Sequence, residues 1–136
     1  MLKVVLDTNI VISAALSPTG NCAKIFDIIT ADNDQIQLFC NEVILLEYQN
    51  VLSRKHLNIK VRKQEIFLET IKNVGQEIVP TPSNVPLPDE SDRIFFDTAL
   101  ASGAILITGN KKHYPPEYFV LLPAEFLRLF EQPSME

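Results

Sequence analysis

Polar side chains that could do chemistry follow the short apolar runs of this sequence. Asp7 comes directly after the run 2–6, and Thr108 and Asn110 follow the run that ends at Ile107. If these runs are parallel strands, their carboxyl ends meet at one edge of a sheet, where ligands bind in open α/β folds. Carboxylate, hydroxyl and amide groups at such an edge predict an acidic cleft. The competing interpretation of Asp7 is a helix N-cap for the segment that follows it.

Glu47 is a carboxylate on an apolar side of a predicted helix. At about 100° per residue, Val43, Ile44 and Val51 lie within roughly 60° of it. Burying a charged group on such a stripe is costly unless it is paired or bound to a metal ion. A partly exposed glutamate on a short helix is the alternative, and Leu45 on another side of the helix keeps it open.

Asp92 repeats this arrangement near the start of a later predicted helix. Phe96, Ala99 and Gly103 fall within about 40° of it, so the acid stands above a stripe that should pack on the sheet. A first-turn acid also stabilises the helix dipole by roughly 0.3–1 kcal/mol, which would explain Asp92 without a site. Asp97 lies about 140° away around the helix, so we do not count it in the cleft.

The elements that must position these acids alternate along the chain. Strands are expected at 2–6, 35–40, 77–79, 104–107 and 119–122. Helices are expected at 9–16, 21–30, from an Asn41 cap to 54, 63–74, 91–102 and from 123 onward. The prolines of 80–88 exclude both helix and central strand. The alternation predicts a single domain over 1–136, an α/β/α sandwich with a mostly parallel central sheet and helices on both faces.

Composition excludes several classes of protein. With 46% apolar and 21% charged residues, the chain has the proportions of a folded globular protein rather than a disordered one. No apolar run approaches the roughly 20 residues that span a bilayer, and the first run is too short for a signal peptide. Cys22 and Cys40 lack CxxC spacing, which favours free thiols in a reducing cytoplasm. The net charge of −5 argues against a protein that coats nucleic acid electrostatically.

In order along the chain, these motifs resemble those of the PIN-domain family. Residues 4–9, Val-Val-Leu-Asp-Thr-Asn, resemble the opening of PIN domains, a strand that ends in an acid followed by Thr and Asn. Glu47 looks like the family's second acid on its helix, and Asp92 within 89–99 is similar to the third. Ile-Thr-Gly-Asn at 107–110 resembles the fourth motif. The resemblance covers essentially the whole chain.

The resemblance implies metal-dependent hydrolysis of RNA phosphodiester bonds. The catalytic residues would be Asp7, Glu47, Asp92 and Asn110. Asp7 and Asp92 would hold Mg²⁺, or Mn²⁺ in its place, and Glu47 would hold a water molecule through hydrogen bonds. The residues expected to orient these acids or contact the substrate are Thr8, Asn9, Thr108 and Lys111.

Asn110 departs from the family pattern, because many relatives carry a fourth carboxylate there. An amide brings no charge, so tight binding of a second metal ion is weakened. Asp97 would compensate only if its helix were rotated from the expected position. The departure also keeps open an alternative function, a non-catalytic RNA- or protein-binding module with a degenerate acidic site.

The segment 122–127, Leu-Pro-Ala-Glu-Phe-Leu, is similar to the tail of a subgroup regarded as toxin components of toxin–antitoxin pairs. This similarity implies a toxin whose partners are single-stranded or structured RNA and a cognate antitoxin protein. We also expect a cytoplasmic homodimer that does not contact membranes.

Two other classes place an aspartate after the first strand. A haloacid-dehalogenase-like phosphatase needs a second aspartate two residues on, where this chain has Asn9, and a receiver domain needs adjacent acids there. Neither pattern fits. His113 is a conceivable general acid, but a histidine beside two lysines in a loop favours a surface or phosphate-contact role.

Overall fold

The central strand β1 (Leu2–Leu6) carries the sheet, because its last three residues are fully buried between helices on both faces. In the computed structural model, which describes residues 1–31 and 34–132, β1 is flanked by four other strands. These are β2 (Ile36–Cys40), β3 (Gln76–Glu77), β4 (Ile105–Ile107) and β5 (Val120–Leu121). The strand order is β3-β2-β1-β4-β5 and every pairing is parallel, with Leu2 opposite Ile36 and Leu6 opposite Ile107. The order reverses at β1, which places the crevice of an open α/β sheet at the end of this strand.

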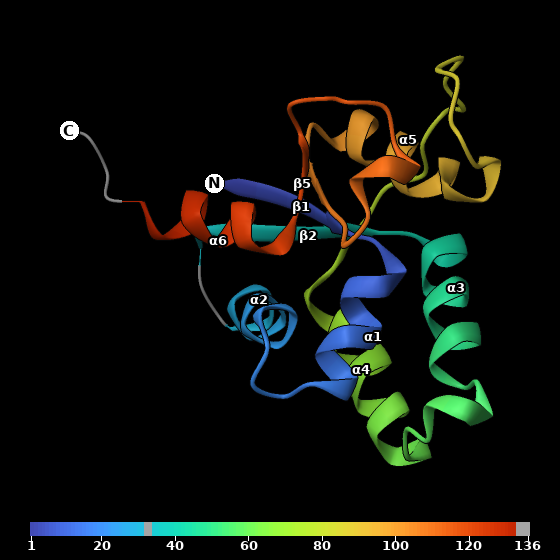
Figure 1. The fold of residues 1–136 in the computed structure, drawn as a ribbon, viewed down its shortest axis with the longest axis vertical. Coiled ribbons are helices and arrows are strands. Elements are labelled where there is room, and N and C mark those ends of the chain that lie inside the picture. Colours follow the sequence, from blue (N-terminus) through green and yellow to red (C-terminus); the bar gives the residue numbers. More distant parts are fainter. Residues whose placement is uncertain (32–33, 133–136) are drawn as a thin grey trace.

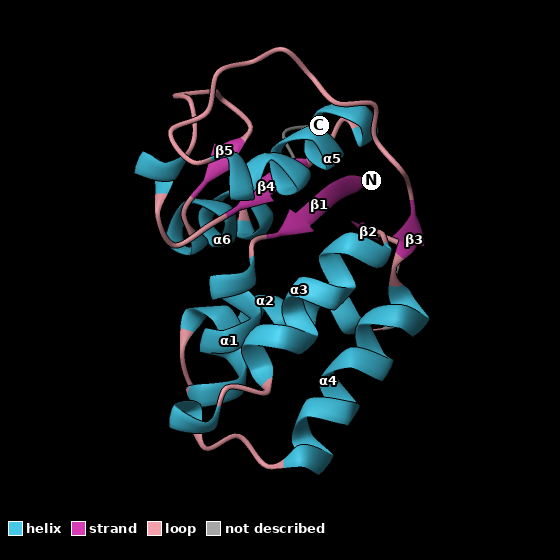
Figure 2. Cartoon of the chain, turned by 90° about the vertical axis from the view of Figure 1, so that its right-hand side faces the viewer, coloured by secondary structure: helices cyan, strands magenta, loops and turns pink. Residues whose placement is uncertain are grey.

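Helices cover both faces of the sheet, as the alternation predicts. They are α1 (Thr8–Leu16), α2 (Asn21–Thr30), α3 (Glu42–Leu52), α4 (Val61–Val74), α5 (Arg93–Ser102) and α6 (Pro123–Glu131). Helix α5 packs on β1, β2 and β4 from one face, while α2 and α4 pack on β2 from the other. Figure 1 shows α3 at the end toward which β1 runs, and Figure 2 shows the strands in magenta with α1, α3 and α4 below them. Short 3-10 turns η1 (Lys55–Leu57), η2 (Glu90–Asp92) and η3 (Lys111–His113) complete the chain.

Capping residues fix where the helices nearest the carboxyl edge begin and end. Asp7 has an extended backbone and accepts a hydrogen bond from the Thr8 amide, so it is the N-cap of α1. The Asn41 side chain caps α3 and donates to the Thr98 hydroxyl, which ties α3 to α5. Gly103 ends α5 with φ +68°, a conformation that glycine adopts without strain.

Several expected boundaries and faces differ from the structure. Helix α4 begins at Val61 rather than at 63, and β3 covers Gln76–Glu77 rather than 77–79. On α3, Val43 is 57% exposed, so the apolar stripe expected through Val43 is wrong. The buried face of that helix consists instead of Ile44, Tyr48 and Leu52. The period of four packs these three residues on the core because residues at i and i+4 share one face.

Other expectations are confirmed. The proline-rich stretch 80–88 contains neither helix nor strand, and Cys22 and Cys40 are free thiols. Burial raises the pKa of both thiols. Among the residues that the structure describes, no helix is long and apolar enough to span a membrane.

Candidate active site

Asp7 lies at the centre of a dense hydrogen-bond network at the end of β1. Its side chain is buried, and one carboxylate oxygen accepts from the Thr8 amide at 2.8 Å. The other accepts from the hydroxyls of Thr108 at 2.7 Å and Tyr114 at 3.0 Å, and from the Asn9 amide at 3.3 Å. These donors come from α1, from the residue after β4 and from the residue after η3. Asp7 is therefore held in one orientation by separate segments of the chain.

The groups that hold Asp7 are themselves fixed. The Asn9 side-chain oxygen accepts from the Gly109 amide at 2.8 Å, and the Thr108 hydroxyl accepts from the Asn110 amide at 3.1 Å. The Tyr114 ring stacks on Phe96, with centroids 6.4 Å apart and planes 14° from parallel. Burial and the nearby Asp7 carboxylate raise the pKa of Tyr114 far above its ordinary value, so its hydroxyl stays protonated and donates.

A cavity of about 370 Å³ opens beside Asp7. It is lined by the carboxylates of Asp7, Glu47 and Asp92, so β1, α3 and η2 bring the three acids named from the sequence to one place. Glu47 is exposed at the mouth, whereas Asp7 is buried in the wall. The remaining lining residues are Thr8, Asn9, Ile12, Ser13, Val51, Arg54, Ser91, Phe95 and His113.

Asp92 has the clearest signature of an incomplete site. Its side chain is 16% exposed, and its buried Oδ2 atom has no hydrogen-bond partner in the described chain. Burial, followed by the negative charges of Asp7 and Asp89, raises the pKa of Asp92 to about 6. His113, whose Nδ1 lies 3.5 Å from Oδ2, opposes this increase in pKa.

Thr8 contributes a second orphaned oxygen to the same cavity, because its buried hydroxyl also has no partner within residues 1–31 and 34–132. Buried polar atoms are normally paired, and exceptions call for a bound group or a functional reason. Two such atoms beside a carboxylate therefore indicate a place for a ligand with complementary charge or donors.

The oxygen donors around this cavity fit a magnesium-like cation. In the described ranges, no three Asp, Glu, His or Cys side chains form a ready cluster for a metal ion. Mg²⁺ needs no such cage, since it is usually held by one or two carboxylates together with waters and substrate phosphates. The carboxylates of Asp7 and Asp92, with the unpaired Thr8 hydroxyl near them, match that donor set.

Three residues assigned to the site from the sequence lie outside this cavity. Asn110 is exposed, and its side-chain nitrogen lies 3.0 Å from His113 Nε2, so it reaches the cavity only through that ring. The Lys111 ammonium forms an ion pair with Glu125 at 2.8 Å. Thr108 is also absent from the lining and touches the site through its bond to Asp7.

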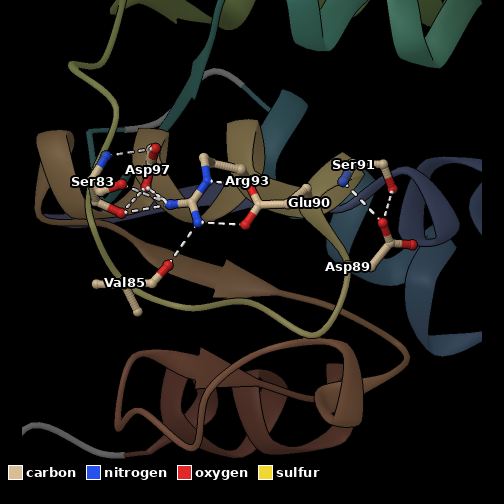
Figure 3. A network of polar contacts seen from close by, with 7 residues as sticks. All are labelled: Ser83, Val85, Asp89, Glu90, Ser91, Arg93 and Asp97. Carbon is tan, nitrogen blue, oxygen red and sulfur yellow. Dashed lines mark hydrogen bonds and ion pairs between the residues drawn. The ribbon is translucent and has the colours of Figure 1, made fainter.

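Asp97 belongs to a separate network, as its position on the helical wheel predicts. Its carboxylate accepts from the Ser83 amide at 3.0 Å and from the Ser83 hydroxyl at 2.6 Å. Arg93 reaches the Ser83 and Val85 carbonyls and pairs with Glu90. Figure 3 shows this network, which fastens the stretch 80–88 to α5. Asp97 therefore holds a loop in place rather than lining the acidic cavity.

Sequence reasoning missed two residues of the site. Tyr114 donates to Asp7, but it follows a 3-10 turn in an irregular loop, where no periodicity marks it. Arg54 lines the cavity, and its guanidinium has no hydrogen bond or ion pair with any residue that the structure describes. Helical spacing does not account for the place of Arg54, because α3 ends at Leu52 rather than at 54 and Arg54 follows it with an extended backbone.

The parallel sheet and the acids at its carboxyl edge define an α/β/α sandwich protein with an acidic site at the topological switch point. A family model described as PIN domain matches residues 3–112, and the chain belongs to the PIN-domain family. It is similar to an uncharacterised protein of Methanocaldococcus jannaschii, with 37% identity over 114 residues that cover 81% of this chain and 72% of the relative. PIN domains are generally nucleases, implying RNA binding, and generally use divalent metal ions.

Proposed function

We propose that this protein is a Mg²⁺- or Mn²⁺-dependent endoribonuclease that hydrolyses RNA phosphodiester bonds. The observation that carries the proposal is the pair of orphaned oxygens, Asp92 Oδ2 and Thr8 Oγ1, in one cavity with Asp7. A site that served only to cap helices would have paired these atoms. The nuclease character of the family supports the same chemistry.

Asp7 and Asp92 hold the cation in this proposal. When bound, it supplies Lewis-acid polarisation of the phosphate and neutralises the repulsion between the acids. Glu47, exposed at the cavity mouth, accepts a hydrogen bond from the attacking water and orients it toward phosphorus. Thr108, Tyr114 and Asn9 keep the Asp7 carboxylate from rotating away.

Arg54 is the substrate-binding group that the cavity itself supplies. Its guanidinium has no partner among the described residues and lines the same cavity as the acids. The planar fork of arginine matches two phosphate oxygens, and its charge offsets the repulsion between RNA and the carboxylates. Asn110 contributes by holding the His113 ring, which lines the same cavity, whereas the charge of Lys111 is paired with Glu125 until a substrate phosphate competes for it.

Cleavage of a labelled single-stranded RNA tests this function. The wild-type protein should cleave only with added Mg²⁺ or Mn²⁺ and should stop when EDTA is added. Asp7→Asn and Asp92→Asn should each abolish cleavage. Both variants are needed because Asp7 also caps α1, so its substitution alone could act through folding. Undiminished cleavage in EDTA, or by a folded Asp92→Asn protein, would contradict the proposal and leave the non-catalytic binding module.

We further propose that the protein is a cytoplasmic homodimer and the toxin of a toxin–antitoxin pair. The support is the similarity of 122–127 to such toxins. In the structure this segment opens α6, where Glu125 binds the Leu122 amide and Lys111. Expression of the protein should arrest growth of a bacterial host, and co-expression of the neighbouring small reading frame should relieve the arrest. Light scattering of the purified protein should give twice the mass of the 15.3 kDa chain.

A further inference from the structure

A second cavity, of about 500 Å³, opens in the loop between η3 and β5, drawn in orange in Figure 1. Its lining includes amines, aromatic rings and prolines, among them Lys112, Tyr114, Pro115, Pro116 and Tyr118. None of the acids of the first cavity lines it. This combination of positive charge and flat apolar surface is typical of sites that bind single-stranded nucleic acid.

The two cavities are adjacent because consecutive residues of one turn line them in alternation. His113 lines the acidic cavity, whereas Lys112 and Tyr114 on either side of it line the second. Neighbouring Cα atoms are only about 3.8 Å apart. Tyr114 also donates its hydroxyl to Asp7, so it connects the second cavity to the centre of the acidic site. Tyr118 lies two residues before Val120, which pairs with Leu106, whereas Asp7 follows Leu6, which pairs with Ile107. A chain with one phosphate at Asp7 would therefore reach Tyr118 with a nucleotide a few positions along the RNA, since four residues of strand span about 13 Å.

Tyr118 is the most unusual feature of the second cavity. It is 91% exposed, and within residues 1–31 and 34–132 the one aromatic ring that it contacts is Phe119, at 5.7 Å between centroids and 86° between planes. The ring faces are therefore open to solvent. Exposed aromatic rings stack on the bases of single-stranded RNA, with little dependence on sequence because every base has a flat face.

Lys112 supplies the charge that a phosphate needs. Its ammonium has no hydrogen bond or ion pair within the part of the chain that the structure describes, in contrast to Lys111, which pairs with Glu125. Glu117 also lines this cavity and repels phosphate. The phosphate is thus directed to Lys112, and Glu117 is left to accept hydrogen bonds from an amino group of a base.

We infer that the second cavity is a nucleotide subsite, in which an RNA nucleotide a few positions from the scissile phosphate stacks its base on Tyr118 and places its phosphate against Lys112. The inference rests on the proposed ribonuclease function, since that function places the scissile phosphate of the RNA at the acidic cavity. It adds a base-binding element to the phosphate-binding groups of the acidic cavity.

Binding of fluorescent ten-nucleotide RNAs, measured by anisotropy in EDTA, separates this inference from cleavage. Tyr118→Ala should weaken binding at least about fivefold, and Tyr118→Phe should bind like the wild type because the ring remains. An RNA of the same length without bases should bind Tyr118→Ala and wild type equally. Lys112→Ala should weaken the binding of both RNAs and reduce the magnitude of the slope of log affinity against log salt by about 0.7. Lys72→Ala, an exposed lysine on α4, is the control and should change neither.

Equal weakening of the base-free and base-containing RNAs by Tyr118→Ala would overturn the stacking role. Unchanged RNA binding together with lost self-association would overturn the subsite and assign Tyr118 to a protein interface. If the wild type fails to cleave RNA in Mg²⁺ but these binding differences are found, the ribonuclease proposal fails and the RNA-binding cavity stands. Melting temperatures should not change, since the Tyr118 side chain is almost entirely exposed.

Discussion

Replacing Asp92 by asparagine should stabilise the metal-free protein at neutral pH. The folded pKa of Asp92 is about 6 against an ordinary value of 3.8. This difference corresponds to about 3 kcal/mol of unfavourable free energy when the carboxylate is charged. Asparagine has nearly the same shape and no charge, so Asp92→Asn should recover most of that free energy. For a chain of this length the gain is about 10 °C in melting temperature.

The pH dependence gives the sign of the effect. Because the folded pKa lies above the unfolded one, the stability that Asp92 contributes is complete below pH 4, falls between pH 4 and 6, and stays lost above pH 6. In EDTA, the melting temperature of the variant should therefore be higher than that of the wild type at pH 7.5 and equal to it near pH 4. Added Mg²⁺ should raise the melting temperature of the wild type and have much less effect on the variant.

Thermal melts followed by circular dichroism, in EDTA at pH 4 and 7.5 and in Mg²⁺ at pH 7.5, measure these differences. Asp89→Asn is the matched control, three residues away. Asp89 accepts from the Ser91 amide and hydroxyl, which lower its pKa, so neutralising it should not stabilise the protein. A variant Asp92→Asn that melts below the wild type at pH 7.5 in EDTA, or a difference independent of pH, would refute the burial argument.

Two other substitutions test contacts of the acidic cavity. Arg54→Ala should raise KM for RNA cleavage about tenfold with little change in kcat, whereas Lys55→Ala, at an exposed position, should alter neither constant. If both variants raise KM equally, the effect comes from the overall positive charge and not from a contact of Arg54 in the cavity. Tyr114→Phe should lower the free energy of unfolding by about 1–2 kcal/mol in urea titrations and should reduce kcat, because Asp7 loses a buried hydrogen-bond donor. An unchanged kcat would show that Thr108 and Asn9 position Asp7 without Tyr114.

The strands and helices were predictable where local patterns were strong. The continuous run Val4–Leu6 predicts a strand covered on both faces, and these residues are fully buried in β1. Asn41 and Gly103 mark helix boundaries through side-chain and backbone chemistry that acts within a few residues. The start of α4 was less predictable, because no side-chain hydrogen bond caps its N-terminus.

The candidate site was predictable only in part, for physical reasons. The acids at strand ends and first turns are visible in sequence because they depend on local position. The contact between Tyr114 and Asp7 joins residues 107 positions apart through an irregular loop, and no periodicity encodes it. The place of Asn110, outside the cavity and against His113, depends on the path of η3 after β4 in the same way.

Asp7 and Asp92 differ in how many hydrogen bonds hold them, and this difference predicts which of the two is lost first during evolution. Asp7 accepts hydrogen bonds from four groups on three segments, so its replacement disrupts the fold as well as the chemistry. Asp92 has an oxygen without a hydrogen bond to any described residue, and its charge is unfavourable, so a lineage released from selection for cleavage gains stability by replacing it. Descendants that keep the scaffold for another purpose should then retain the first aspartate as a vestige and show a neutral residue at the position of the second.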